Sequence, residues 1–246
     1  MKVLIYMPTY NTSKTLVQTI SKIPKNLDCE YIVVDNGSKD NSVQLAKSLG
    51  LRVIRHYHNR GYGGSQKTAY IYAIGSKADV VVMLHSDDQY DPTLLNQILK
   101  PIKDDEADVV FGSRILGAKA LEGGMPRYKY VSNRFLTRLE NSALGTNISE
   151  FHSGYRAFRI KALEKIPFLF NSDSWLFDSE IIFQLVLARL RIKEISIPTK
   201  YHATASSIPF FESIIYGLGV LKLIIRFYLY RLGILKSKQF IFSARG

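Results

Sequence analysis

Short runs of apolar residues recur along the first half of this chain, and polar residues or glycine follow each run. The most uniform run, VVVML at residues 80–84, stops abruptly at His85. A short apolar run bounded by polar turn residues is typical of a strand that is buried on both faces of a sheet. On the same pattern we expect strands at residues 2–7, 30–34, 51–56, 108–112 and 191–197.

Segments of mixed apolar and polar residues separate these runs, and several begin at residues that cap helices. Asp91 followed by Pro92, for example, is a good helix start, because the carboxylate can accept from the backbone N–H groups of the first turn. Strands alternating with helices in this way predict an α/β fold with a doubly wound, mostly parallel sheet. We expect the helices at residues 13–21, 43–48, 66–73, 93–100, 129–144 and 175–190, with a glycine-rich loop at 58–65.

The last long element, residues 209–232, is rich in Ile, Leu, Phe and Tyr. Its longest stretch without a charge is residues 213–221, well short of the roughly 20 apolar residues that span a bilayer. Lys222 and Arg226 are expected on one helical face, opposite an apolar surface. Two interpretations are open: an amphipathic helix in the membrane interface, or a helix packed on the sheet or on a second subunit of a homo-oligomer. We therefore divide the chain into a main domain, residues 1–207, and a helix with a basic tail, residues 208–246.

Composition narrows the classes of protein that fit. The chain has 246 residues, enough for one large domain, with 33 Lys and Arg against 21 Asp and Glu and a net charge of +12. This balance favours an anionic partner or surface. No nucleic-acid-binding module is recognisable, and we expect no nucleic-acid partner. Cys29 is the single cysteine, which excludes an intrachain disulfide and a cysteine-based zinc site and fits the cytoplasm.

The densest polar cluster follows the central apolar run directly, where His85, Asp87 and Gln89 alternate with other residues. Ligands of open parallel sheets bind beyond the carboxyl ends of the strands, so these three side chains can converge on one point. Carboxylate and amide oxygens with one imidazole suit a hard divalent cation, Mg²⁺ or Mn²⁺, whose coordination substrate phosphates complete. The alternative is a polar turn that only caps the following helix through Asp91.

Other predicted strands end in loops that would share the same crevice. Tyr10 can stack on a nucleoside base, and Asp35 can accept a hydrogen bond from a ring N–H. The glycines within residues 61–64 let the backbone approach a ligand closely, and a cation beside Arg114 can neutralise a diphosphate. Each signal is weak alone, since Tyr10 also fits a core position, but together they predict a nucleotide site.

Residues 61–68, GYGGSQKT, nearly match the phosphate-binding pattern G-x-x-x-x-G-K-[ST]. The position of the second required glycine is Gln66, whose side chain would occupy the space in which the loop wraps the phosphate. The chain also has no G-x-S-x-G and no H-E-x-x-H motif. The pattern therefore disfavours a nucleotide triphosphatase of this type and the common hydrolases.

A set of motifs stands in a fixed order: PTYN at 8–11, VVDNGSKD at 33–40, LHSDDQYDP at 84–92, GSR at 112–114 and SGYRAF at 153–158. This ordered set resembles the family-2 glycosyltransferases of the GT-A fold, most of all the polyprenyl- and dolichyl-phosphate sugar synthases, over roughly residues 2–205. Some positions depart from the family pattern. His85 replaces the first acid of the D-x-D metal motif, Thr12 stands where relatives often have Glu, and Asn36 replaces an aspartate.

The resemblance implies roles for the residues that match these motifs. Pro8, Tyr10 and Asp35 would lie around the base and ribose, and Asp87 with Gln89 would hold the metal. The full set of predicted nucleotide-binding residues is Pro8, Tyr10, Asn11, Asp35, Gly63 and Ser86, and the predicted metal ligands are His85, Asp87 and Gln89. The predicted catalytic residues are Asp87, Asp88, Arg114 and Arg156, and the predicted acceptor or phosphate-binding residues are Ser113, Ser153, Gly154, Glu180 and His202.

The identity of the acceptor decides whether a general base is needed. Asp88 and Glu180 are the candidate bases for an alcohol acceptor, although Glu180 better fits a helix cap or a solvent-facing position. A lipid phosphate is already anionic, and positioning by arginines such as Arg127 and Arg134 would suffice. His202 is expected to help close the diphosphate site.

The reaction that the resemblance implies is a one-step, inverting transfer of a hexose, glucose or mannose, from a UDP- or GDP-hexose to a polyprenyl phosphate. The enzyme would be cytoplasmic, peripheral at the cytoplasmic face of the membrane, and assisted by Mg²⁺ or Mn²⁺. One alternative is a transferase with a soluble or another lipid acceptor. Another is a non-catalytic nucleotide-sugar-binding subunit, which His85 and Asn36 would fit.

Overall fold

The fold is organised around one sheet. The structure, a computed structural model, describes residues 1–117, 120–198 and 208–242. Its strands are β1 (Val3–Thr9), β2 (Cys29–Asp35), β3 (Arg52–Arg55), β4 (Val80–Met83), β5 (Val109–Ser113), β6 (Arg156–Arg159) and β7 (Ile192–Ser196). They form a seven-stranded sheet in the order β3-β2-β1-β4-β6-β5-β7. Within the described ranges neighbouring strands pair in parallel, except that β6 runs antiparallel to β4 and β5. The predicted mostly parallel α/β sheet is confirmed.

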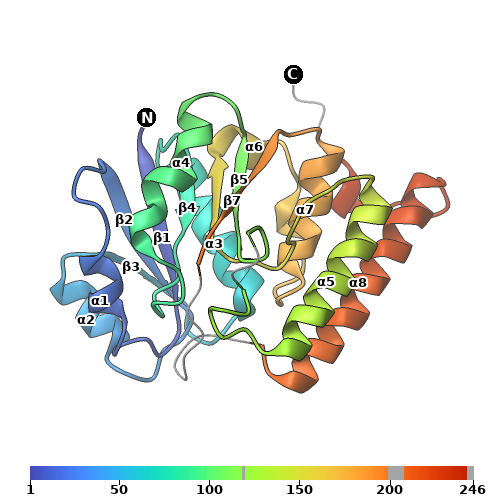
Figure 1. Cartoon of the computed structure of the whole chain (residues 1–246). Helices are drawn as coiled ribbons and strands as arrows, with labels where there is room; N and C mark the ends of the chain where they lie inside the picture. Colours follow the sequence, from blue (N-terminus) through green and yellow to red (C-terminus); the bar gives the residue numbers. More distant parts are fainter. Residues whose placement is uncertain (118–119, 199–207, 243–246) are drawn as a thin grey trace.

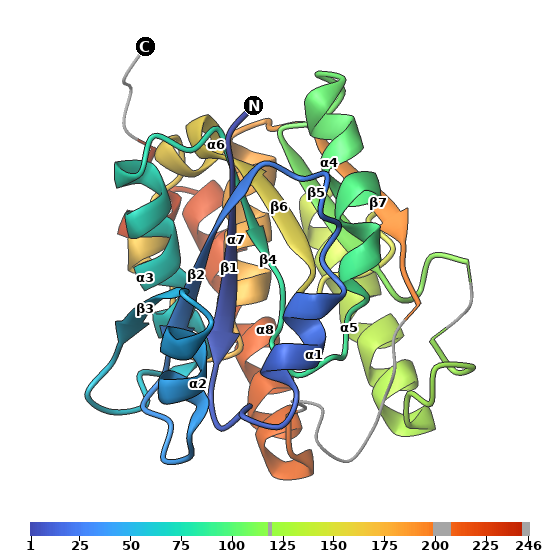
Figure 2. The same ribbon diagram turned by 90° about the vertical axis from the view of Figure 1, so that its left-hand side faces the viewer.

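Helices lie on both faces of the sheet (Figures 1 and 2). They are α1 (Leu16–Ser21), α2 (Ser42–Ser48), α3 (Gly61–Gly75), α4 (Leu95–Lys103), α5 (Arg127–Leu144), α6 (Ile160–Glu164), α7 (Phe177–Leu187) and α8 (Phe210–Arg231), with short 3-10 turns η1 (Pro92–Leu94), η2 (Phe168–Phe170) and η3 (Lys238–Phe240). In β1, Leu4 and Tyr6 pack towards α3, α6 and α7, whereas Val3, Ile5 and Met7 pack towards α1, α2 and α4. Burial of both strand faces explains the continuous apolar runs of the sequence.

The antiparallel strand β6 and the short helix α6 after it were not predicted. The strand is only residues 156–159, and it begins and ends with arginine. Arg156 is buried although it is charged, because the protein surrounds it with acceptors described below. A short strand that contains a buried charge has no apolar period by which the sequence could reveal it.

The glycine-rich segment expected as a loop at residues 58–65 is partly helical, and that expectation is wrong. α3 begins at Gly61, so the glycines form its first turn. A Cβ atom on Gly63 would lie 2.4 Å from the Ser172 carbonyl oxygen and 2.8 Å from Phe177 Cβ. The glycines therefore allow the segment before α7 to pack directly on the backbone of α3.

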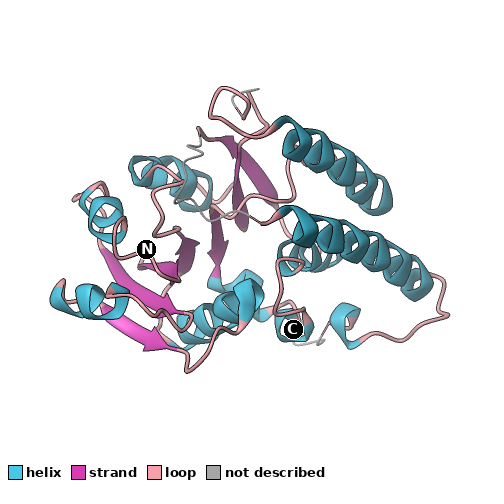
Figure 3. Ribbon diagram, turned by 90° about the horizontal axis from the view of Figure 1, so that it is seen from below, coloured by secondary structure: helices cyan, strands magenta, loops and turns pink. Residues whose placement is uncertain are grey.

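α5 and α8 lie side by side at one edge of the molecule (Figures 1 and 3). The inner face of α8 packs through Leu223 and Phe227 on Phe183 of α7 and on Phe240. The rings of Phe183 and Phe227 are 5.2 Å apart and nearly perpendicular. Among the described helices none is long and apolar enough to cross a membrane.

The outer face of α8 differs from the expected one. Ile215, Leu218 and Ile225 are 60–69% exposed on it, and Lys222 lies on the same face, four residues after Leu218. Arg226, four residues after Lys222, is half-buried and donates to Gln239 Oε1 at 3.0 Å. The two basic residues are thus one turn apart as expected, but exposed apolar residues share their side of the helix. α8 is apolar both where it packs on the protein and where it is exposed.

Candidate active site

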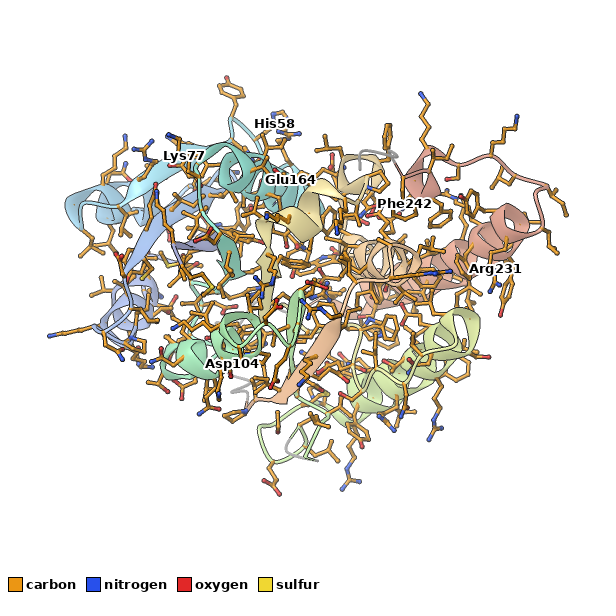
Figure 4. The ribbon with its side chains drawn as sticks, turned by 90° about the horizontal axis from the view of Figure 1, so that it is seen from above. His58, Lys77, Asp104, Glu164, Arg231 and Phe242 are labelled. Atoms are coloured by element: carbon orange, nitrogen blue, oxygen red, sulfur yellow. The ribbon has the colours of Figure 1, made fainter. Side chains whose placement is uncertain are left out.

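The carboxyl ends of β1, β2 and β4 lie together at one edge of the sheet, the lower edge in Figure 1. A cavity of about 510 Å³ opens there, within the range of about 300–1,000 Å³ usual for small-molecule sites. Figure 3 views the molecule from this end, and Figure 4 from the opposite end, where Lys77 and Asp104 lie. We call the cavity the β-end pocket; its walls include Pro8, Tyr10, Asn36, Ser86, Asp87 and Ser174.

Hydroxyl groups tie the loop after β4 to the loop after β1. Ser86 Oγ donates to the Pro8 carbonyl oxygen at 2.9 Å. It also lies 3.2 Å from Thr9 Oγ1 and 3.1 Å from Thr12 Oγ1. Thr15 Oγ1 donates to the Ser86 carbonyl oxygen at 2.7 Å. Thr12, which departs from the family pattern, is therefore one of the groups that fix this wall of the pocket.

The predicted metal ligands are divided between two pockets. Asp87 is buried and lines the β-end pocket, and its Oδ1 accepts from the Gln89 backbone N–H at 3.1 Å. Gln89 lines a second pocket, and His85 lines both. Among the residues that the structure describes, no group of three or more His, Cys, Asp or Glu side chains could hold a metal ion. These side chains fit Mg²⁺ or Mn²⁺ only together with oxygen atoms of a ligand, the usual arrangement for Mg²⁺ beside phosphates.

His85 lies at the junction of the two pockets in a closely packed position. Its ring centroid is 5.1 Å from that of Tyr90, with the planes nearly perpendicular. A Cβ on Gly154 would lie 2.5 Å from His85 Nε2, so only glycine leaves room for the imidazole. Burial lowers the pKa of His85, which keeps the ring neutral. Its Nε2 has no hydrogen-bond partner among the described residues, and a neutral ring nitrogen can still bind a ligand.

The second pocket lies between the N-terminal halves of α5 and α8. We call it the α5–α8 pocket; its walls include Gln89, Arg114, Lys129, Leu136, Asp178 and Tyr216. Tyr62, His85 and Trp175 line both pockets, so the two adjoin at these three side chains. The sequence analysis selects His85 but neither aromatic residue, because Tyr62 lies in a segment considered for its glycines and no motif includes Trp175.

Arg114 follows β5 and forms part of the α5–α8 pocket. Its Nε donates to Glu150 Oε1 at 2.8 Å, and its backbone N–H donates to Glu150 Oε2 at 2.7 Å. Nη2 donates to the His152 carbonyl oxygen at 2.8 Å. Burial alone would raise the pKa of Glu150, but the Arg114 charge together with the hydrogen bonds from Arg114 and Asn133 outweighs it, so the pKa is lowered and the pair is ionised. Glu150 therefore holds the guanidinium in place and offsets part of its charge.

Arg156, a predicted catalytic residue, is buried and lines neither pocket. Its Nε and Nη2 donate to the carbonyl oxygens of Ser153 and Phe151, each at 2.7 Å. Its Nη1 lies 3.2 Å from Asp178 Oδ1. These contacts place Arg156 beneath the site, where it holds the loop before β6 and the start of α7.

Asp178 is a residue of this site that sequence reasoning missed. It lines the α5–α8 pocket, accepts from Tyr62 Oη at 3.1 Å and accepts from Gln66 Nε2 at 2.9 Å. Together with Arg156 these contacts connect α7, α3 and β6. The only signal in the sequence is an acid at the start of a predicted helix, which also fits ordinary helix stabilisation.

The predicted nucleotide-binding residues fall into two groups. Pro8, Tyr10 and Ser86 line the β-end pocket. Asn11 and Asp35 instead accept from the backbone N–H groups of residues 39 and 38, at 2.9 and 3.2 Å, and so shape the loop after β2. The Gly63 N–H donates to the residue 173 carbonyl oxygen at 2.8 Å, away from the pocket. The structure thus brings half of this set to the cavity wall.

Neither candidate general base faces the pockets. Asp88 is paired with Lys22 Nζ at 2.5 Å. Glu180 is buried and accepts from the Ser172 N–H at 2.6 Å. The expected capping or solvent-facing position of Glu180 is therefore wrong, because the chain before α7 folds back over it.

The predicted acceptor and phosphate residues are also divided. Gly154 lines the α5–α8 pocket beside His85. Ser113 and Ser153 are buried, and Ser113 Oγ lies 2.6 Å from Ser149 Oγ, where it helps to hold the loop after β5. His202 lies outside the described residues.

A buried polar network joins α5, α7 and α8 behind the α5–α8 pocket. His152 Nδ1 lies 2.6 Å from Tyr216 Oη, which is 2.9 Å from Ser179 Oγ. Glu140 Oε2 lies 3.3 Å from His152 Nε2. Burial raises the pKa of Glu140 to about 8 and lowers the pKa of His152 to about 3. At neutral pH the network is therefore mainly uncharged.

Replacing Glu140 with glutamine is expected to flatten the pH dependence of stability. The unfolded carboxyl ionises near 4.5, whereas the folded one keeps its proton up to about pH 8. The stability that this proton provides is complete below the unfolded pKa and is lost as the pH rises through the folded pKa, by up to about 1.4 kcal/mol per pH unit. Glutamine cannot ionise, so Glu140→Gln should gain unfolding free energy over the wild type as the pH rises.

Urea unfolding of both proteins at pH values between about 5 and 9 measures this difference, with the exposed Glu164→Gln as the matched control. The control should follow the wild type at every pH. A difference between Glu140→Gln and the wild type that stays constant with pH would show that Glu140 is ionised in the folded state.

The fold and these pockets define the class of protein. A mostly parallel α/β fold with a nucleotide-sized cavity at its strand ends, adjoining a pocket that contains cationic groups, is the architecture of GT-A nucleotide-sugar-dependent glycosyltransferases. The family model of glycosyl transferase family 2 matches residues 4–167, and the chain belongs to this family. The family resemblance predicted from the ordered motifs is confirmed.

Relatives with curated names include lipid-linked sugar transferases. A UDP-N-acetylglucosamine–dolichyl-phosphate N-acetylglucosaminyltransferase of Methanococcus voltae is 29% identical over 80% of this chain and 86% of its own length. A dolichyl-phosphate hexose transferase of Haloferax volcanii is 28% identical over 89% of this chain and 92% of its own length. Among solved structures, glucosyl-3-phosphoglycerate synthase from Mycobacterium tuberculosis, in complex with Mn²⁺, UDP-glucose and phosphoglyceric acid, has a TM-score of 0.68. That match is 20% identical, covers 96% of this chain and 81% of that one, and confirms the fold.

Proposed function

We propose that this chain transfers a hexose from a UDP- or GDP-hexose to a polyprenyl phosphate at a membrane surface. The position of the α5–α8 pocket carries this proposal. It adjoins the β-end pocket on one side, and two helices with exposed apolar residues form its other side. A lipid acceptor could place its phosphate in this pocket and leave its hydrocarbon chain along those helices. The names of the Methanococcus and Haloferax relatives support the same acceptor class.

The β-end pocket would hold the nucleotide diphosphate. Tyr10 is 45% exposed at its wall and can stack on the base. Asp87 and the neutral imidazole of His85 would hold Mg²⁺ or Mn²⁺, which supplies positive charge that stabilises the leaving diphosphate when bound. Asn36, by contrast, donates to Asn59 Oδ1 at 2.8 Å and accepts from the Arg60 N–H at 2.9 Å. An ionised aspartate could accept the second of these hydrogen bonds but could not donate the first.

The α5–α8 pocket suits an acceptor that needs positive charge and no general base. Arg114 and Lys129 lie on its walls, and burial together with the Arg114 charge lowers the pKa of Lys129. An anion between these two cations would oppose that shift and be stabilised by both. The candidate bases Asp88 and Glu180 lie elsewhere, and a lipid phosphate can attack the anomeric carbon without one.

The exposed sides of α5 and α8 would contact the membrane, with residues 208–242 forming much of this contact. We call this area the α5–α8 surface. Soluble monomers rarely expose apolar patches above a few hundred Å². Arg127, Arg134 and Arg138 recur on α5 at helical spacing, and Lys222 lies among the apolar residues of α8. Each such charge near anionic lipid contributes about 1 kcal/mol to membrane binding. If a second copy of the chain covered this surface instead, like charges would be brought together.

The apolar residues of the α5–α8 surface are Tyr128, Val131, Phe135, Phe211, Leu218 and Ile225, each 46–79% exposed.

The test combines vesicle binding with turnover. Wild-type protein with Mg²⁺ or Mn²⁺ and UDP-glucose or GDP-mannose should release nucleoside diphosphate when anionic vesicles carry a polyprenyl phosphate. The double variant Leu218→Glu, Ile225→Glu should lose vesicle co-sedimentation and at least about 90% of this turnover, because two charges placed in the interface oppose insertion. The matched control, Val17→Glu with Ile71→Glu, changes exposed apolar residues on α1 and α3.

Other outcomes would favour other functions. Equal turnover of both double variants with a water-soluble phosphate acceptor would indicate a soluble-acceptor transferase. Concentration-dependent dimerisation that Leu218→Glu with Ile225→Glu abolishes, without any vesicle binding by the wild type, would indicate that this surface joins two subunits. Binding of nucleotide sugar without turnover against either acceptor would indicate a binding subunit.

A further inference from the structure

Two aromatic side chains stand at the junction of the pockets. Tyr62 and Trp175 line both pockets. Their rings are stacked, with centroids 4.4 Å apart and planes inclined by 22°. Trp175 is only partly buried and is the single tryptophan of the chain. Neither residue belongs to the groups proposed above to hold the nucleotide, the metal or the acceptor phosphate.

The protein holds this aromatic pair in place from several sides. The Gly63 and Gly64 N–H groups donate to the Asp173 carbonyl oxygen, at 2.8 and 3.3 Å. Lys67 Nζ pairs with Asp173 Oδ1 at 2.7 Å. The segment before Trp175 is thus clamped to the first turns of α3. Glycines that in the sequence resembled a phosphate-binding loop serve here to seat this segment.

Contacts also limit the movement of the second ring. Tyr62 Oη donates to Asp178 Oδ2 at 3.1 Å, and the buried carboxylate is itself paired with Arg156. The Tyr62 ring therefore cannot turn away without breaking a buried hydrogen bond, which is costly. Trp175 packs against a fixed ring, and its indole is presented at the boundary of both pockets.

The reaction itself requires a sugar at this boundary. In a one-step displacement the bond to the leaving diphosphate breaks while the bond to the acceptor oxygen forms, both at the anomeric carbon. That carbon must be reached from the β-end pocket and from the α5–α8 pocket together. Only Tyr62, His85 and Trp175 among the described residues line both. His85 is closely packed against Gly154 and Tyr90, so the aromatic pair offers the broader surface.

We propose that Trp175 positions the transferred hexose, with its indole face packed on the apolar C–H groups of the pyranose ring. This inference rests on the proposed function and deepens it. The C–H groups of a sugar carry partial positive charge, and the face of an aromatic ring carries partial negative charge, so the two attract beyond simple burial of area. Trp175 is a positioning residue for the sugar, and the nucleotide is recognised elsewhere, in the β-end pocket.

Because Trp175 is the only tryptophan, its fluorescence reports on this site directly in the wild-type protein. Titrations with UDP and UDP-glucose, and with GDP and GDP-mannose, should be compared in the presence of Mn²⁺ under selective tryptophan excitation. We expect a larger change in emission with the nucleotide sugar than with the matching nucleoside diphosphate. Identical changes with both ligands of a pair that binds would overturn the inference.

Substitutions of Trp175 test the contact between its indole and the hexose through the affinities of nucleotide ligands. Trp175→Ala should weaken binding of the nucleotide sugar about tenfold, at the upper end for a single aromatic contact. The affinity for the nucleoside diphosphate alone should change less than about twofold, since the proposal places the hexose, and not the diphosphate, against the indole. Trp175→Phe should keep most of the wild-type affinity for the nucleotide sugar, because phenylalanine retains an aromatic face. The control Tyr57→Ala removes a fully exposed aromatic side chain that lines neither pocket.

These measurements separate the proposed function from the positioning role of Trp175. If neither nucleoside diphosphates nor nucleotide sugars bind the wild type, the proposed function fails. If they bind and the hexose is transferred, but Trp175→Ala weakens the diphosphate and the nucleotide sugar equally, the positioning role of Trp175 fails. Should Trp175→Ala not fold, Trp175→Phe and the wild-type fluorescence decide the question by the same comparison.

Discussion

Replacing Asp87 with alanine is expected to reduce hexose transfer at least about 100-fold, the size of effect seen when one contact that stabilises developing charge is removed. Asp87 is the buried carboxylate of the β-end pocket, at the end of the central strand β4. Without it, the site loses the acid that would hold a cation against the leaving diphosphate. Release of nucleoside diphosphate at saturating donor and acceptor measures the loss, and Tm shows whether the fold is intact.

Two comparisons make this test specific. Asp91→Asn removes a nearby negative charge from a residue that only caps η1, where Asp91 Oδ1 accepts from the Thr93 N–H at 2.9 Å, and should keep wild-type turnover. Calorimetric titration with Mn²⁺ in the presence of UDP measures metal affinity independently of turnover. Asp87→Ala should lower this Mn²⁺ affinity. Full activity of Asp87→Ala, with unchanged Mn²⁺ affinity, would refute the metal assignment.

Arg156→Met is expected to destabilise the protein by about 3–5 kcal/mol, because it leaves the Asp178 carboxylate buried without its ionic partner. The guanidinium also satisfies the Ser153 and Phe151 carbonyl oxygens. The double variant Arg156→Met, Asp178→Leu should recover part of the loss, since the uncompensated charge is then gone. Urea unfolding of the single and double variants measures both effects.

The exposed ion pair of Lys193 and Glu106 provides the control for Arg156. Lys193 lies on β7 and is about half exposed, so Lys193→Met should cost less than about 1 kcal/mol. If Arg156→Met keeps wild-type stability but loses transfer, Arg156 acts on the substrate after all, as the family resemblance implies. A loss of stability that explains the loss of activity would assign Arg156 to the support of the site.

Much of the architecture follows from local patterns in the sequence. The runs at residues 80–84 and 109–111 are apolar throughout because β4 and β5 are buried on both faces, so the side chains that point to either face must be apolar. Asp87 and Ser86 were located for a related reason. Polar residues directly after a buried strand must lie at its carboxyl end, where parallel strands place their ligands.

Other features depend on tertiary contacts that the local sequence pattern does not show. Glu180 was expected at a helix start facing solvent or acting as a cap, but Ser172 and the chain around it bury it. The glycines at 61–64 suited a ligand-binding loop, and Gly61 does line the β-end pocket, but the segment before α7 also packs on them. Local propensity describes what a segment can do. The Glu180 contact forms only when the chain before α7 folds back over it, and the glycine contacts form only when segments about 110 residues apart meet.

The sequence by itself therefore determined the mostly parallel sheet, the polar strand ends at which the cavity opens and the family, because these depend on the order and period of neighbouring residues. The tertiary structure alone decided which polar residues face the pockets. Arg156 turned inwards to Asp178, and Tyr62 met Trp175 at the junction. The physical reason is that burial and pairing depend on which residues are neighbours in three dimensions. The residue type alone does not show whether a charged or aromatic side chain supports a site or contacts its ligand.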